Sequence, residues 1–398
     1  MDDDEGTTPP PIYRLPEDTL HQIFASLPLR QIIVCRSLSR FFLQTLTSPA
    51  FLRLISPLFP LRLLALRPPH HHHHHHHHHP HHTHHQQQLL LPSPSSPAAL
   101  LHAFDPRDNL WLRFSLAFLP FRSLHPVASS LGLVYLWGDS SADSPDPAKS
   151  LVACNPLTRR FSVLPQLGSA WSRHGSVLVD SANRVMVLTE LAALYFTGSG
   201  SGSGSGSTRW LKFSSNLPSK PRSPVLASDA VYALCDIGSP WRSQWKLFSC
   251  SLRTQKSAHH WIRLEKNEWG DVFDILKRPR LVKGTENNIL MVGGLKSSFA
   301  LNASCSTILI LKLDLETLEW EEAGRMPVEM FQCFAESSKF KVFGGGNRVC
   351  FSGKRVGRLA LWDCFDKKAE WRWIDGIPPH GDGFCRGFVF EAGLTELP

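Results

Sequence analysis

The sequence predicts an α+β multidomain chain, with a three-helix module at the N-terminus followed by an all-β propeller of six blades closed by strands from both ends. Two patterns indicate this division. Residues Leu15 to Phe51 carry apolar side chains at helical spacing. After residue 98, a large aromatic residue recurs about every fifty residues, each time after an apolar, strand-like run. The composition agrees, because 30 prolines and 26 glycines in 398 residues favour many turns and short strands.

The N-terminal module is predicted to contain three short helices. The apolar residues of the first helix follow the i, i+3, i+4, i+7 spacing: Leu20, Ile23, Phe24 and Leu27. Pro28 ends this helix, and a second apolar run follows over Ile32 to Phe42. The third helix is expected to end at Ser48, because a residue before proline is disfavoured in the helical conformation. A unit of about 40 residues buries too little surface to be stable alone, so we expect it to bind a partner.

The order of short motifs in this module resembles the F-box. The motifs are Leu15-Pro16, Ile23-Phe24, Leu27-Pro28, Val34-Cys35-Arg36 and Arg40-Phe41-Phe42. The family usually has a tryptophan where this chain has Phe41 and Phe42, and we expect these aromatic side chains to serve in its place. The resemblance implies docking onto a Skp-type adaptor, which joins the chain to a cullin and a RING subunit. It implies these adaptor-binding residues: Leu15, Pro16, Leu20, Ile23, Phe24, Leu27, Pro28, Ile32, Val34, Cys35, Arg36 and Phe41. The alternative is an ordinary surface helical bundle.

The recurring aromatic residues mark repeat units. They are Trp111, Phe161, Trp210, Trp261, Trp320 and Trp371, at separations of 50, 49, 51, 59 and 51 residues. Five complete units cover 125–378, and each can be divided into four strands, which is typical of a propeller blade. The strand-like runs at 99–104 and 111–116 lack partners, so we expect residues 387–392 to supply the first strand of a sixth, composite blade, and the sequence near them to supply the second.

The repeat region resembles the kelch repeats of plant-type F-box proteins. Its glycine signature is degenerate, since only Gly293-Gly294 occupies the family's double-glycine position at the end of a second strand. Period and strand order therefore support the kelch assignment. The expected domains are a disordered acidic and proline-rich N-terminus (1–11), the F-box (12–57), a low-complexity His/Gln/Pro/Ser tether (58–97) and the propeller (98–398), with a disordered Gly/Ser loop at 198–207.

The candidate client-binding residues lie on the loops expected at one end of the ring. Loops that join the second and third strands, or successive blades, emerge together and are the longer ones, and recognition residues usually lie on such loops. Arginine and aromatic residues are typical interface anchors, which makes Arg173, Trp241 and Arg242 the candidates. Such residues would suit an acidic or phosphorylated client segment. The alternative is that a tryptophan packs between blades. The basic run Lys277 to Arg280 is too short for a nucleic-acid interface and is expected to form a solvated loop.

The sequence predicts no catalytic site, metal site or cofactor. We find no HExxH motif, nucleophile elbow or Walker loop. The ten consecutive histidines, His70 to His79, lack the fixed geometry of a structural metal site and are interpreted as part of the tether. Nine scattered cysteines and the absence of an apolar leader or long apolar run predict reduced thiols in the cytoplasm or nucleus and no membrane contact.

Together with the family resemblance, these features imply the substrate receptor of a Skp-cullin-F-box ubiquitin ligase. Such a receptor holds a client protein near a ubiquitin-conjugating enzyme, while other subunits perform the chemistry. Two alternatives remain. One is a non-degrading scaffold whose F-box binds the adaptor without assembling a cullin, and the other is a propeller enzyme or small-ligand receptor. The sequence does not identify the client.

Overall fold

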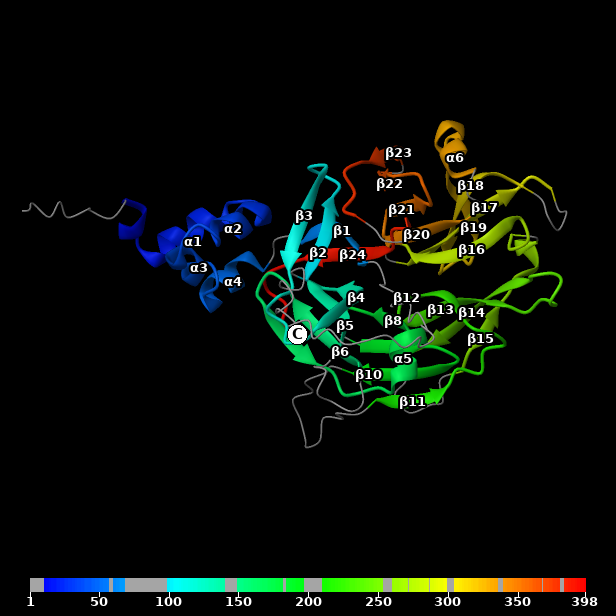
Figure 1. The fold of residues 1–398 in the computed structure, drawn as a ribbon, viewed down its shortest axis with the longest axis horizontal. Coiled ribbons are helices and arrows are strands. Elements are labelled where there is room, and N and C mark those ends of the chain that lie inside the picture. The colour runs from blue at the N-terminus through cyan, green and yellow to red at the C-terminus, as the bar shows by residue number, and fades with distance from the viewer. Residues whose placement is uncertain are drawn as a thin grey trace, which may run out of the picture.

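The computed structural model describes residues 11–56, 60–68, 99–139, 149–181, 184–196, 210–252, 260–270, 272–285, 287–298, 304–335, 339–366, 368–379 and 383–398. The predicted disordered N-terminus before Pro11, the polyhistidine tract and the Gly/Ser loop lie outside these residues. Within them, the chain forms a helical module beside a ring of six antiparallel four-stranded sheets (Figure 1). The predicted fold class is confirmed.

The N-terminal module contains four α-helices instead of the three that were predicted. The elements are η1 (Pro11–Arg14), α1 (Glu17–Ala25), α2 (Leu29–Cys35), α3 (Arg40–Thr45) and α4 (Pro49–Ile55). The run from Ile32 to Phe42 is divided because Ser39 is extended and its side chain accepts a hydrogen bond from the Phe42 N–H at 3.2 Å, which begins α3. Ser48 is also extended, as expected before proline, but Pro49 then occupies the first turn of α4, where its missing N–H costs nothing. The prediction that the helices end at Ser48 was therefore wrong.

Each blade has four strands, which follow one another from the central channel outward. Blade 1 contains β24 (Gly387–Ala392), β1 (Leu61–Leu66), β2 (Leu100–Asp105) and β3 (Leu110–Ser115); blade 2 contains β4 (Ser123–Ser130), β5 (Leu133–Asp139), β6 (Lys149–Asn155) and β7 (Arg160–Val163). Blade 3 contains β8 (Ser176–Val179), β9 (Arg184–Leu188), β10 (Leu191–Phe196) and β11 (Leu211–Ser214); blade 4 contains β12 (Arg222–Ala227), β13 (Ala230–Asp236), β14 (Trp245–Ser251) and β15 (Ile262–Leu264). Blade 5 contains β16 (Leu276–Lys283), β17 (Asn288–Lys296), β18 (Cys305–Asp314) and β19 (Trp320–Arg325); blade 6 contains β20 (Phe340–Gly345), β21 (Arg348–Gly353), β22 (Leu359–Phe365) and β23 (Lys368–Ile374). The innermost strands β24, β4, β8, β12, β16 and β20 contact one another in this order around the channel.

The recurring aromatic residues all lie in the fourth strand of a blade or one residue before it, which confirms the predicted repeat. Two of them join neighbouring blades through the indole N–H. Trp111 Nε1 donates to the Asp375 carbonyl at 2.9 Å, and Trp210 Nε1 donates to the Pro165 carbonyl at 2.7 Å. These two tryptophans therefore help to hold adjacent sheets together.

The ring is closed by strands from both ends of the chain, as predicted. Strand β24 pairs with β1 in a register that runs from Leu61 opposite Ala392 to Leu66 opposite Gly387. The sequence analysis had assigned β1 to the tether and expected the second strand of this blade near residues 387–392, and both expectations were wrong. Because β1 and β2 are neighbours in one sheet, residues 67–99 form a connection within blade 1 and do not join the F-box to the ring. The last four residues of β1 are all buried, so the strand lacks the alternating pattern that identifies strands in sequence.

The helical module packs directly against one end of the ring. Leu394 after β24 is 3% exposed within the helical core, and Leu61 and Leu157 also pack there. Arg30 of α2 forms an ion pair with Asp108 in the β2–β3 turn. We call this the F-box end of the ring. The opposite end, where the connections between second and third strands emerge, is called the distal end.

Asn155, at the end of β6, organises the surface on which the helices rest. It is fully buried, and its Nδ2 donates to the carbonyls of Gly393 and Glu396, each at 3.1 Å. Its Oδ1 accepts from the Leu157 N–H at 3.0 Å and the Thr158 N–H at 3.2 Å. One side chain thereby fixes both the C-terminal tail and the turn that carries Leu157.

Two further features concern the whole described chain. All nine cysteines are free thiols. In the part that the structure describes, no helix is both long and apolar enough to span a membrane.

The first prediction concerns Asn155. We expect Asn155→Ala to lower the free energy of unfolding in urea by more than about 2 kcal/mol, because each buried polar group left without a partner costs about 1–3 kcal/mol. Limited proteolysis should also release the helical module sooner. Asn267→Ala, at an exposed position of η2 (Asn267–Trp269), is the control and should behave as the wild type. Equal stability of the two variants would contradict this role for Asn155.

Candidate protein-interaction sites

The F-box helices expose an unusual amount of apolar surface. Among the described residues, seventeen large apolar side chains are exposed, and seven of these lie between residues 13 and 54. Their exposed fractions range from 38% to 64%: Tyr13, Leu15, Ile23, Val34, Leu38, Leu43 and Leu54. Concentration of exposed apolar side chains in so short a segment is typical of a protein-binding surface.

The structure divides the twelve predicted adaptor-binding residues by exposure. Exposed are Leu15, Pro16, Ile23, Pro28 and Val34, and half-buried are Leu27, Cys35 and Phe41. Leu20, Phe24 and Ile32 are only 1%, 4% and 0% exposed, because they form the core of the module together with Leu46 and Phe51. The expectation that these three contact an adaptor is therefore corrected: they support the exposed residues from beneath.

Arg36 is placed against the propeller. Burial lowers the pKa of its guanidinium below the ordinary value, and the nearby positive charge of Arg159 in the β6–β7 turn lowers it further. Arg36 is half-buried, so part of its side chain stays accessible, and its adaptor contact stays a prediction.

Phe41 and Phe42, which stand where the family usually has tryptophan, form an aromatic cluster. Their ring centroids lie 4.9 and 5.8 Å from that of Tyr13, and Phe42 packs edge-on against Phe24 at 5.3 Å. Both side chains are half-buried. They contribute to the packing of the module and leave part of their surface accessible.

At the distal end, the loop 237–244 between β13 and β14 presents Trp241 and Arg242. Trp241 is 88% exposed, the largest exposed fraction among the large apolar side chains of the described residues. Asp236 holds the loop: its Oδ1 accepts from the N–H groups of Gly238 at 3.0 Å and Gln244 at 2.8 Å. Burial acts to raise the pKa of Asp236, but these hydrogen bonds outweigh it and the pKa lies below its ordinary value.

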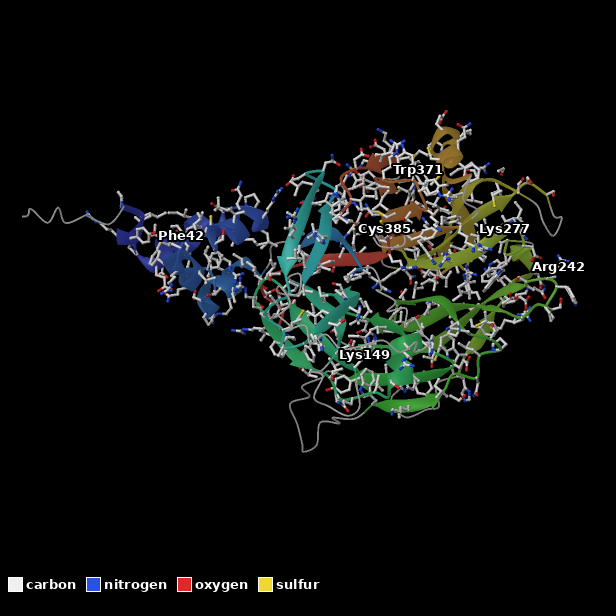
Figure 2. The ribbon with its side chains drawn as sticks, in the orientation of Figure 1. Phe42, Lys149, Arg242, Lys277, Trp371 and Cys385 are labelled. Atoms are coloured by element: carbon white, nitrogen blue, oxygen red, sulfur yellow. The ribbon has the colours of Figure 1, made fainter. Side chains whose placement is uncertain are left out.

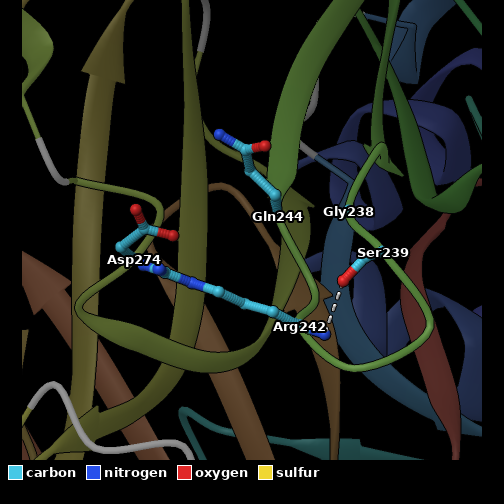
Figure 3. A pocket seen from close by; sticks show the side chains of 5 residues that line it. All are labelled: Gly238, Ser239, Arg242, Gln244 and Asp274. Carbon is cyan, nitrogen blue, oxygen red and sulfur yellow. Dashed lines mark hydrogen bonds between the residues drawn. The ribbon is translucent and has the colours of Figure 1, made fainter.

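Arg242 lines a small polar pocket beside this loop. The pocket has a volume of about 330 Å³ and is also lined by Gly238, Ser239, Gln244 and Asp274. The backbone N–H of Arg242 donates to the Ser239 Oγ at 3.2 Å, and the Arg242 side chain extends toward Asp274 (Figure 3). The ordered loop thus combines an exposed indole with a guanidinium at its base.

Arg173 lies apart from this loop. It is exposed on α5 (Ser169–His174), a helix between blades 2 and 3 that the sequence analysis did not predict. The helix is anchored by Trp171, which is 8% exposed in the core of those blades. In the described chain, no hydrogen bond or ion pair connects Arg173 with residues 237–244. The three candidates share the distal end but do not form one constellation.

The segment before blade 5 differs from its prediction. The segment containing Trp269 and Phe273 packs beside Trp320, and the Trp269 Nε1 donates to the Leu318 carbonyl at 2.8 Å. The basic residues Lys277 to Arg280, expected in a solvated loop, belong to strand β16. They lie at the distal mouth of the channel, beside Arg222, Lys339 and Lys341. No sequence signal linked these cations, because they come from three blades.

The exposed apolar residues of the F-box and the Trp241 loop lie far apart. Phe42 and Arg242 appear at opposite sides of the molecule (Figure 2). Within the described residues, no three His, Cys, Asp or Glu side chains gather as a metal site would require. The arrangement therefore offers two separate surfaces for macromolecules on one molecule.

Comparison with known proteins agrees with this organisation. A model of the F-box domain matches residues 12–54. SKP1-interacting partner 15 of Arabidopsis thaliana is 63% identical over 390 residues, covering 98% of this chain and 99% of the relative. Protein UNUSUAL FLORAL ORGANS of Arabidopsis thaliana is 25% identical over 311 residues, covering 73% of this chain and 66% of that protein. Among solved structures, YjhT has 9% identity and a TM-score of 0.40, covering 69% of this chain and 91% of its own. With an F-box at its N-terminus and a relative of this similarity along almost its whole length, the chain belongs to the F-box protein family.

Proposed function

We propose that this chain is the substrate-recognition subunit of a Skp-cullin-F-box ubiquitin ligase. Its F-box binds a Skp-type adaptor, through which it joins the cullin and RING subunits, and the distal end of its propeller binds a client protein. The observation that carries the proposal is the pair of exposed surfaces at opposite ends of one body. An adaptor bound at one end leaves the other end free for the client.

The adaptor surface is formed by the exposed apolar residues of the helices. Ile23 in α1 is 43% exposed and Val34 in α2 is 54% exposed, whereas their neighbours Phe24 and Ile32 anchor the core. Burying such side chains against a partner contributes about 25 cal/mol per Å². The name of the relative, SKP1-interacting partner 15, supports an adaptor of the Skp type.

The chain itself acts without catalysis in this proposal. Holding a client close to a charged ubiquitin-conjugating enzyme raises the effective concentration of the client, and the covalent steps belong to other subunits. The nine free thiols support a reducing compartment, the cytoplasm or the nucleus.

We further infer that the blades are of the kelch type. Four strands per unit and the period of about fifty residues support this. The double glycine, Gly293-Gly294, lies within β17, two residues before its end. A Cβ on Gly294 would lie 2.5 Å from the Cys305 Sγ, and one on Gly293 would lie 3.0 Å from the Leu276 Cβ. A side chain at either position would therefore crowd Cys305 or Leu276, which favours glycine at both.

The second prediction tests the adaptor surface. Ile23→Asp combined with Val34→Asp should weaken co-purification with a Skp-type adaptor by more than about ten-fold, because a charge would be buried in an apolar interface. Val328→Asp is the matched control, since Val328 is 61% exposed at the start of α6 (Val328–Ala335) on the propeller. Circular dichroism should show that all variants fold.

Unchanged adaptor binding by the double variant would refute the docking model. Cullin should be recovered together with the adaptor from the wild type. Recovery of the adaptor without cullin would favour the non-degrading scaffold over a ligase subunit.

The third prediction tests the distal end. Trp241→Ala should leave the free energy of unfolding within about 0.5 kcal/mol of the wild type, because the side chain is almost fully exposed. Client capture by proximity labelling should fall by about ten-fold or more, as for loss of an aromatic interface anchor. The labelling is done with the Ile23→Asp, Val34→Asp background, so that clients are retained. Phe365→Ala, 69% exposed at the F-box end of β22, is the control. Equal capture by both variants would exclude Trp241 from the client surface.

A further inference from the structure

A basic pocket lies at the distal mouth of the central channel. It has a volume of about 360 Å³ and is lined by the beginnings of β12 and β16 and by residues at the beginning of β20. Its six cations are Arg222, Lys277, Arg278, Arg280, Lys339 and Lys341. No carboxylate is among the described residues that line it. Figure 2 marks Lys277 on blade 5, on the side of the molecule away from the helices.

The backbone at the pocket is shaped by irregular strand pairing. The register of β16 against β17 shifts between Lys277 and Arg280, and that of β12 against β13 shifts between Arg222 and Val225. Within the first shift, Arg278 has a φ of 55°, which residues other than glycine rarely adopt. Bulges of this kind redirect side chains and are frequent beside functional sites. Two neighbouring blades therefore deviate from regular pairing where their arginines meet.

Two arginines of the pocket have no neutralising partner. In the described chain, Arg278 and Arg280 form no ion pair or side-chain hydrogen bond. Burial, followed by the charges of Arg280 and Arg278, lowers the pKa of Arg222 to about 10. Burial, Arg278 and then Arg386 likewise lower the pKa of Arg280. Burial and mutual repulsion thus disfavour the charged forms of these arginines, and a bound anion would relieve the repulsion.

Aromatic rings hold two of the cations at the rim. The guanidinium of Arg222 lies 4.9 Å from the ring centroid of Trp245, and the Lys341 Nζ lies 5.7 Å from that of Phe384. Such contacts limit the freedom of long side chains before a ligand arrives. A half-buried, positioned guanidinium forms stronger charge-assisted hydrogen bonds than a solvated one.

The chemistry of the pocket favours a phosphate group. A phosphomonoester carries a charge of about −1.5 to −2 and three strong acceptor oxygens, which match several guanidinium and ammonium donors better than a single carboxylate does. The pocket volume of about 360 Å³ suits one such group, and the pocket differs from the extended basic stripe that nucleic acids require. We propose that this pocket binds the phosphate of a phosphorylated segment of the client.

The position of the pocket supports a client as the source of the phosphate. Arg222 pairs with Leu234 near the end of β13, and its guanidinium lies over the ring of Trp245, so it is next to both ends of the loop that carries Trp241. One extended segment that contacts Trp241 can therefore place a phosphate in the pocket. This inference rests on the proposed function, because it specifies which feature of the client the distal end recognises.

The fourth prediction uses the full-length chain and a degenerate library of fluorescent peptides centred on phosphoserine or phosphothreonine. Fluorescence anisotropy should show binding about ten-fold tighter than for the unphosphorylated library. Arg278→Gln combined with Arg280→Gln should remove this preference. Arg160→Gln combined with Lys212→Gln removes the same charge from exposed positions of β7 and β11 and should retain it.

A second arm distinguishes the source of the phosphate. Inositol hexakisphosphate should compete with the phosphopeptides for the pocket of the wild type. If it binds while the phosphopeptides do not, the pocket serves a free phosphate ligand and the proposal is overturned. Equal binding of phosphorylated and unphosphorylated libraries, or full binding by the Arg278→Gln, Arg280→Gln variant, would overturn it too.

Adaptor co-purification is measured on the same samples. Loss of phosphopeptide binding with intact adaptor binding contradicts only the phosphate assignment. Failure of the wild type to bind an adaptor contradicts the proposed function and leaves the peptide measurement valid as a test of the pocket.

Discussion

The pairing of β24 with β1 is the constraint on which the rest of the structure depends. It removes the open edges that an incomplete ring would expose. At the distal end it brings the two chain segments together, since the Arg67 N–H donates to the Arg386 carbonyl at 2.8 Å. At the other end it places Leu394 beside the helices. One pair of strands therefore positions both the F-box and part of the positive charge around the channel.

The five complete blades could be predicted from the sequence because every blade repeats the same pattern of buried and aromatic residues. A buried second strand and an aromatic residue at the fourth strand recur in every unit, as at Trp320 and Trp371. The closing blade depends on a partner far away in the chain, and nothing local identifies Leu61–Leu66 as a strand. The predicted helix boundaries were wrong for a different reason. Ser39 and Ser48 are extended, which suggests the end of a helix, but each serine caps the beginning of the next helix.

The candidate sites were predictable where one loop or motif contains them. Trp241 and Arg242 lie in a single connection, and both are exposed as expected. The motif pattern could not separate Ile23, which is exposed, from its neighbour Phe24, which is buried, since the contacts of four helices decide this. The basic pocket was missed because Arg222 and Arg280 are brought together only by the order of the blades.

The direct contact between the helices and the ring sets the spacing between the adaptor and the client in the proposed ligase. Effective concentration depends on the distance between the two bound partners, and a flexible tether would let that distance vary. In this chain Leu157 and Leu394, both held by Asn155, fix the F-box against the ring. The histidine-rich segment falls between β1 and β2, which are neighbours in one sheet, so it does not separate the helices from the ring.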